Sequence, residues 1–160
     1  MLTMSHMLSY INCKVYTIKV FIGVIFLLSG CCIYFLFRSK TLRIYQWCSA
    51  IGISDSIDVC RGYLQGWHIP DVVKYSFPDG LYNAAYILFM DAIWSKVKSS
   101  YKYAIILLVP FFTITSELLQ YYGIIKGTYD VYDLTCYSAP VFIYIIFRIN
   151  NINNLKTNTI

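Results

Sequence analysis

Four long apolar runs constrain the fold of this sequence more than any other feature. They cover residues 15–37, 79–97, 101–122 and 130–147 of the 160-residue chain. A helix needs about 20 residues to cross a hydrocarbon core, and each run is close to that length. Because backbone polar groups find no partners in lipid, a crossing segment must be helical. The sequence therefore predicts an all-α polytopic membrane protein, a bundle of four transmembrane helices.

Composition indicates the same class. The chain is 58% hydrophobic and 13% charged, whereas an ordinary soluble domain is about 45–50% apolar and about 25% charged. A soluble core of this length could not hide so much apolar surface. The formal charge is +5, but the basic residues cluster beside apolar runs, where they fix membrane topology. We therefore expect the lipid bilayer as a partner and no nucleic acid.

Residues 39–77 separate the first two runs and mix aromatic with charged side chains. A structureless loop of this length is uncommon. The segment contains Trp47 and Trp67, and tryptophans favour the headgroup region of a bilayer. We expect short amphipathic helices that lie at the interface. Residues 148–160 are expected to form a polar tail, and the whole chain is expected to be a single membrane domain.

Several residues mark the predicted helix boundaries. Ser76 is expected to cap the second run, with Asp79 three residues later completing a capping box. Thr128 or Asp130 is expected to cap the last run. Pro110 lies inside the third run, where we expect a kink that neighbouring helices tolerate.

The cysteines and histidines do not indicate a metal centre, and we expect no metal and no cofactor. The six cysteines form no C-x-x-C pair, and the two histidines are far apart. Cys48 and Cys60 share a polar segment, which leaves a disulfide open. Residues 28–31 have the form of a bacterial lipobox. However, the apolar run continues past Cys31 and exceeds the apolar core of a signal peptide, about 7–15 residues, so a spanning helix is favoured.

Polar side chains are predicted to gather at one end of the bundle. Counting crossings places the start of the second run, the end of the third and the start of the fourth on one side of the membrane. An ionisable group in a span is expensive and usually faces a bundle interior or an aqueous pocket. We therefore expect a polar, ligand-binding pocket there. Its expected members are Asp79, Glu117, Gln120, Asp130, Asp133, Arg43 and Arg61.

Three interpretations of this end remain open. The simplest is a structural network in which Arg43 or Arg61 pairs with Glu117 or Asp133. The second is the ligand pocket, and the third is a divalent-cation site built from oxygen ligands. Asp91 lies deeper in the second run, and we expect it to pair with Lys96 or Lys98 near the opposite interface.

No catalytic residue is assigned. The sequence holds no Ser/His/Asp grouping, no Gly-rich phosphate loop and no H-E-x-x-H motif. We favour a non-enzymatic protein. The alternative is an intramembrane enzyme that acts on a lipid or peptidoglycan precursor, with Glu117 as general base and the aspartates holding a divalent cation.

The basic residues also predict an orientation. Four crossings place both termini on one side of the membrane. The short loop between the second and third runs contains Lys96, Lys98 and Lys102. Basic residues in short loops favour the cytoplasmic side. We therefore expect cytoplasmic termini and an outward-facing acidic end.

The motif Glu117-x-x-Gln120, followed by Gly-Thr-Tyr-Asp at residues 127–130 and by Asp133, resembles the signature of the VanZ family of small bacterial membrane proteins. Residues 75–81 (YSFPDGL) are similar to the stretch ahead of the second helix in VanZ-like proteins. The resemblance covers about residues 40–147. The family usually has an arginine before the first aspartate, where this chain has Lys126-Gly-Thr.

The resemblance implies a four-helix protein of the bacterial cytoplasmic membrane. It also implies a link to glycopeptide-antibiotic tolerance, with no established biochemical activity. From the polar pocket itself, we expect an envelope precursor or another membrane protein as a partner. Two further departures from the family pattern are Tyr137, where an asparagine is usual, and Pro140, where a small residue is usual.

Overall fold

The computed structural model describes residues 4–64 and 66–157, with side chains over residues 14–64 and 66–150. The prediction of an all-α fold is confirmed over this range, in which every regular element is a helix. The helices are α1 (Met4–Phe37), α2 (Arg43–Ala50), α3 (Ser54–Tyr63), α4 (Asp71–Tyr75), α5 (Phe77–Ile93), α6 (Tyr101–Ile106), α7 (Leu108–Tyr121) and α8 (Val131–Thr157).

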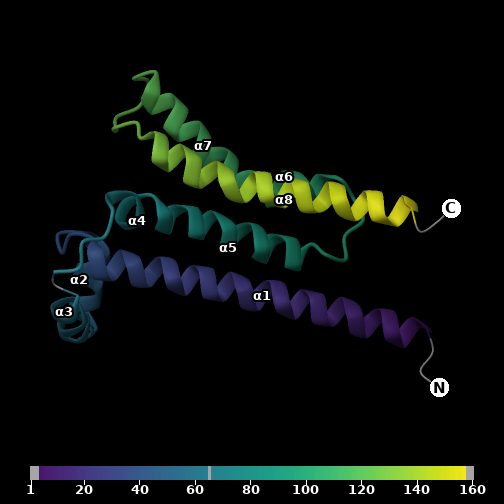
Figure 1. Ribbon diagram of the computed structural model, residues 1–160, viewed down its shortest axis with the longest axis horizontal. Helices are drawn as coiled ribbons and strands as arrows, with labels where there is room; N and C mark the ends of the chain where they lie inside the picture. The colour runs from purple at the N-terminus through teal and green to yellow at the C-terminus, as the bar shows by residue number, and fades with distance from the viewer. Residues whose placement is uncertain (1–3, 65, 158–160) are drawn as a thin grey trace.

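The long helices lie side by side, with α5 between α1 and α8 (Figure 1). The chain direction alternates from α1 to α5, from α5 to α6 and α7, and from α7 to α8. The start of α1 and the end of α8 therefore lie at one end of the molecule (Figure 1). The short helices α2 and α3 and the turn between α7 and α8 lie at the other end (Figure 1).

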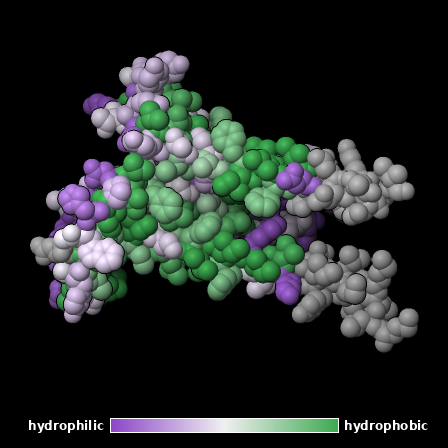
Figure 2. Space-filling view, in the orientation of Figure 1, coloured by the Kyte–Doolittle hydropathy of each residue, from purple (hydrophilic) through white to green (hydrophobic). Residues whose placement is uncertain are grey.

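The outer surface of the bundle is apolar. By length and composition, one helical stretch in the described residues, Lys14–Phe37, is able to cross a membrane. Large apolar side chains are also exposed on α5, α7 and α8, among them Ile93, Phe111, Phe142 and Phe147. Figure 2 shows apolar residues over the middle of the face that it draws, with hydrophilic residues concentrated at the left-hand end. A contiguous apolar surface of this kind marks contact with a membrane or another protein.

The third apolar run contains two helices. α6 ends at Ile106 and α7 begins at Leu108. Pro110 explains the break, because it has no N–H for the Ile106 carbonyl and its ring crowds that carbonyl. The expected kink is therefore a break that lets α7 diverge from α6 (Figure 1).

Two helices end away from the ends of the apolar runs that contain them. α5 ends at Ile93, inside the run 79–97. α8 continues beyond the last run, through polar residues after position 147, to Thr157. The expected short helices between the first two runs are present as α2, α3 and α4.

Small residues allow the helices to approach closely. Gly23 and Gly30 of α1 lie seven residues apart, against the rings of Phe89 and Tyr82 on α5. On the other side of α5, a Cβ added at Gly80 would lie 2.9 Å from the carbonyl oxygen of Cys136 in α8. Small residues at such contacts let the backbones of membrane helices pack tightly.

The helix caps confirm one prediction and correct another. Asp130 caps α8, because its Oδ1 accepts a hydrogen bond from the Tyr132 N–H at 2.8 Å. Ser76 makes no side-chain cap hydrogen bond, so the expected capping box is absent. The reason is that α4 runs almost directly into α5 and buries Ser76 between them. Cys48 and Cys60 are free thiols, so the disulfide left open by the sequence is not formed.

Asp91 links three helices at the end where the termini lie. Its side chain is buried, with 5% of the residue exposed. Oδ2 lies 2.6 Å from Nζ of Lys19 on α1. Oδ1 pairs with Arg148 of α8 and accepts a hydrogen bond from the Tyr144 hydroxyl at 3.0 Å.

The expected pairing of Asp91 with Lys96 or Lys98 is therefore wrong. Both lysines are exposed in the turn after α5, whereas the Asp91 carboxylate is directed at the helices on either side of its own. The expectation considered only the second run and the turn that follows it as sources of a partner. The cations that reach Asp91 come from the first run and from just beyond the fourth.

Removing the Asp91 charge is predicted to destabilise the fold. Asp91→Asn leaves Lys19 and Arg148 without their carboxylate, and breaking such a pair from one side costs about 3 kcal/mol. We expect the Tm in detergent to fall by about 5–10 °C, measured by the loss of helical circular dichroism. Asp71→Asn is the matched control, because Asp71 is exposed and pairs within its own helix. Equal Tm values for the two variants would contradict the prediction.

Candidate functional site

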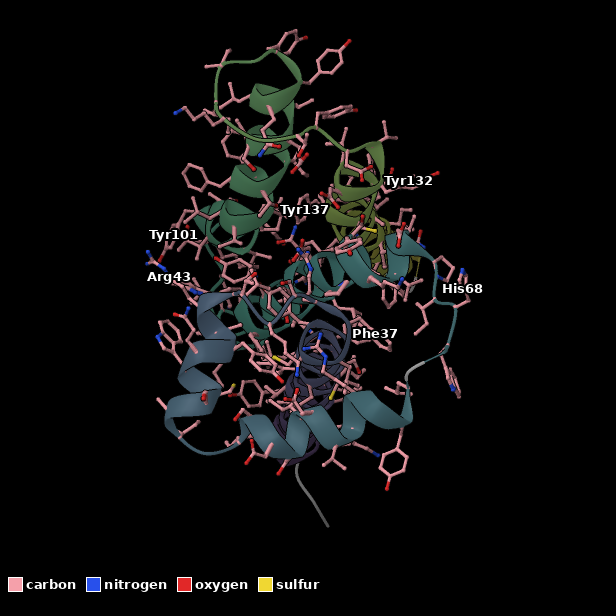
Figure 3. All side chains as sticks on the ribbon, turned by 90° about the vertical axis from the view of Figure 1, so that its left-hand side faces the viewer. Phe37, Arg43, His68, Tyr101, Tyr132 and Tyr137 are labelled. Atoms are coloured by element: carbon pink, nitrogen blue, oxygen red, sulfur yellow. The ribbon has the colours of Figure 1, made fainter. Side chains whose placement is uncertain are left out.

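Four carboxylates gather at the end of the molecule opposite the termini. Asp79 comes from the start of α5, Glu117 from the last turns of α7, and Asp130 and Asp133 from the start of α8. Electrostatic interactions link Glu117 with the three aspartates. Figure 3 looks onto this end of the molecule, with Tyr137 of α8 near its centre. These four residues are called the acidic cluster.

Glu117 is the most deeply buried member of the acidic cluster, with 5% of the residue exposed. Its carboxylate faces the backbone N–H of Asp130. Among the described residues, Oε2 of Glu117 and Oδ1 of Asp133 are buried without a hydrogen-bond partner. Nearly all buried polar atoms in proteins are paired. Two unpaired buried carboxylate oxygens therefore make this cluster unusual among the buried polar groups of the described residues.

Asp79 is the best-compensated member of the cluster. The Tyr137 hydroxyl donates a hydrogen bond to its Oδ2 at 3.3 Å. Nη2 of Arg38 lies 3.8 Å from the same oxygen. Over the part of the chain with described side chains, this is the one ion pair that reaches the cluster. Four carboxylates thus share one nearby cation.

The expected pairing of Arg43 or Arg61 with Glu117 or Asp133 is wrong. Arg61 instead donates from Nε to the Leu36 carbonyl at 3.1 Å and from Nη2 to the Arg38 carbonyl. It thereby caps α1, whose last carbonyls have no partners within the helix. Arg43 is exposed at the start of α2 and forms no ion pair with a described residue. Neither arginine belongs to the acidic cluster.

Gln120 supports the turn between α7 and α8. Its side chain packs so tightly against Gly127 that a Cβ at Gly127 would overlap it. The turn brings Asp130 back towards Glu117. Gln120 is thus a neighbour of the acidic cluster that helps to position it.

A second polar site lies at the same end, where α1 ends and α3 and α4 pack against it. It is a cleft of about 460 Å³ lined by Leu36, Phe37, Lys40, Asp58, Arg61, Gly62, Leu64, Trp67, Lys74 and Tyr75. We call it the basic cleft. Sequence reasoning missed it, although residues 38–43 showed the signal, a cluster of Arg38, Lys40 and Arg43. These basic residues were used only to predict the membrane topology of the chain.

The charges of the basic cleft do not balance. Lys40, Arg61 and Lys74 face one lining carboxylate, Asp58. Nζ of Lys40 lies 2.6 Å from Oδ1 of Asp58, and the Tyr45 hydroxyl donates to the same oxygen. These two hydrogen bonds hold the pKa of Asp58 below its ordinary value. Asp58 therefore stays ionised at neutral pH. Outside the lining, the exposed Asp71 lies 3.4 Å from Nζ of Lys74, so the cleft and this neighbour together carry an excess of one positive charge.

Comparisons with protein-family models, curated proteins and solved structures find no match for this chain. The function is therefore inferred from the chain's own residues. In the stretches that the structure describes, no group of three or more His, Cys, Asp or Glu residues is arranged to hold a metal ion. The divalent-cation site that the sequence left open is therefore not found among these residues.

Neutralising Glu117 is predicted to stabilise the free protein. Glu117→Gln keeps the side-chain size but removes a buried charge that three aspartates repel. An unsatisfied buried group costs about 1–3 kcal/mol, and removing the charge is expected to recover about 1 kcal/mol, a rise in Tm of about 2–4 °C. Thermal unfolding in detergent checks this, with Asp55→Asn on exposed α3 as control. A fall in Tm for Glu117→Gln would show that the carboxylate is a structural group.

Proposed function

We propose that this chain is a multi-pass protein of a bacterial cytoplasmic membrane, similar to VanZ-like proteins. In this proposal it crosses the membrane four times, with cytoplasmic termini and the acidic cluster outside. The alternating directions of α1, α5, α7 and α8 support four crossings. The apolar outer surface and the basic turn after α5 support the same arrangement.

The proposed function is to bind, without covalent chemistry, a positively charged group of a cell-envelope or lipid-linked molecule. The observation that carries this proposal is the buried carboxylate of Glu117, whose Oε2 has no hydrogen-bond partner among the described residues. A buried charge without a partner is strongly unfavourable. In this proposal, a positively charged ligand supplies the missing partner.

A primary ammonium group fits the acidic cluster best. It carries one positive charge and three hydrogen-bond donors, and the cluster offers two unpaired acceptor oxygens and a net negative charge. The cluster lies at the polar end of an apolar bundle (Figure 2), the level at which lipid-linked headgroups sit. A wall precursor with a free amine would connect this function with the glycopeptide-antibiotic tolerance that the VanZ resemblance implies.

Lipid-dependent stabilisation tests this function. We expect phosphatidylethanolamine to raise the Tm of the purified protein more than phosphatidylcholine, which has the same net charge but no N–H donor on its quaternary ammonium group. The difference should be lost in Glu117→Gln and in Asp133→Asn, because each removes an acceptor of the ammonium group. It should persist in Asp55→Asn. A difference that survives Glu117→Gln, or its absence from the wild-type protein, would refute amine binding at this cluster.

A further inference from the structure

We propose that the basic cleft binds the phosphate group of an anionic phospholipid. The cleft shares no carboxylate with the acidic cluster. The inference therefore stands on its own observations and does not depend on what binds at Glu117. It assigns a second ligand class, a phosphate diester, to the same end of the molecule.

The first argument is the set of cationic groups. Lys40, Arg61 and Lys74 come from three separate segments and line one cleft with the carboxylate of Asp58, while Lys74 also pairs with the exposed Asp71 outside it. Nη1 of Arg61 is buried and has no hydrogen-bond partner among the described atoms, while its other nitrogens hold the carbonyls of α1. These hydrogen bonds hold the guanidinium in a fixed position beside the cleft, and Arg is well suited to phosphate.

The second argument is the shape and composition of the cleft. Its volume of about 460 Å³ lies in the range of small-ligand sites, about 300–1,000 Å³. Beside the three cations it is lined by Leu36, Phe37, Leu64 and Trp67. A free phosphate ion would leave this apolar lining unused. The glycerol and the first acyl carbons of a phospholipid would cover it, so a lipid fits the whole cleft.

The third argument is the position of the cleft. It opens beside the short helices at the polar end of the bundle, and Trp67 on its rim is 69% exposed. Exposed tryptophans at the edge of an apolar surface favour the headgroup level of a bilayer. A lipid phosphate lies at that level, and basic residues near the membrane surface attract anionic lipids.

The experiment uses the full chain in a neutral detergent and measures the binding of phosphatidylglycerol by native mass spectrometry. Phosphatidylcholine, which has no net charge, is the comparison lipid. Lys74→Gln and the double variant Lys40→Gln/Lys74→Gln remove cleft charges. Arg61 is left intact because it caps α1. Lys126→Gln is the matched control, since Lys126 is an exposed lysine in the turn between α7 and α8. Glu117→Gln tests independence from the acidic cluster.

We expect the wild-type protein to bind phosphatidylglycerol more tightly than phosphatidylcholine. Each cleft lysine removed should weaken phosphatidylglycerol binding about fivefold. Lys126→Gln and Glu117→Gln should leave it unchanged. An equal loss of phosphatidylglycerol binding in Lys126→Gln would mean that exposed lysines contribute through general charge attraction. That result would overturn the proposed site. Competition by glycerol 3-phosphate at the same concentration as the lipid would assign the cleft to soluble phosphate esters and overturn the lipid assignment.

Discussion

The ion pairs of Asp91 are the interaction on which the arrangement of this protein depends. A carboxylate on the middle helix holds a lysine from α1 and an arginine from α8, so α5 is fixed to both neighbours at one end. Asp79 lies twelve residues earlier on the same helix, about 18 Å along its axis. The ion pairs of Asp91 therefore fix the position of α5 along the bundle axis. This position places Asp79 at the same level as Glu117 and Asp133. Ion pairs suit this purpose, because an unpaired charge in an apolar bundle is strongly unfavourable.

Charged side chains are paired at one end of the bundle and only partly paired at the other. At the terminal end, Asp91 is satisfied by two cations and a tyrosine hydroxyl. At the other end, acids and bases lie near one another without full pairing. Arg38 stands between the two groups, since it donates to the Tyr75 carbonyl at 2.8 Å and approaches Asp79 at 3.8 Å. Tyr75 also lines the basic cleft. An end with unpaired groups of both signs is suited to binding polar ligands, whereas a paired end is suited to holding helices together.

Counting apolar runs was enough to bring the four acidic residues to one end, because that result needs the direction of each helix and nothing finer. The cap at Asp130 was also predictable, since it depends on local chemistry. The partners of Asp91 and Arg61 were not, because they depend on how each helix is rotated about its own axis. A rotation is set by packing, here by Gly23, Gly30 and Gly80 against their neighbours, and packing is a property of pairs of helices. The break at Leu107 was predictable in part. Pro110 indicated that the third run would bend, but the sequence did not show that it would divide into two separate helices.

The central claim is that the chain crosses the membrane four times, with the acidic cluster and the basic cleft outside. Cysteine accessibility in intact cells tests it most directly. Single cysteines at Thr128, between α7 and α8, and at Ser99, between α5 and α6, are introduced into a background without the six native cysteines. They are then treated with a membrane-impermeant thiol reagent. The account predicts labelling at Thr128 in intact cells, and at Ser99 only after the cells are permeabilised. Labelling of both positions in intact cells would contradict four crossings, and labelling of Ser99 alone would place the acidic cluster in the cytoplasm.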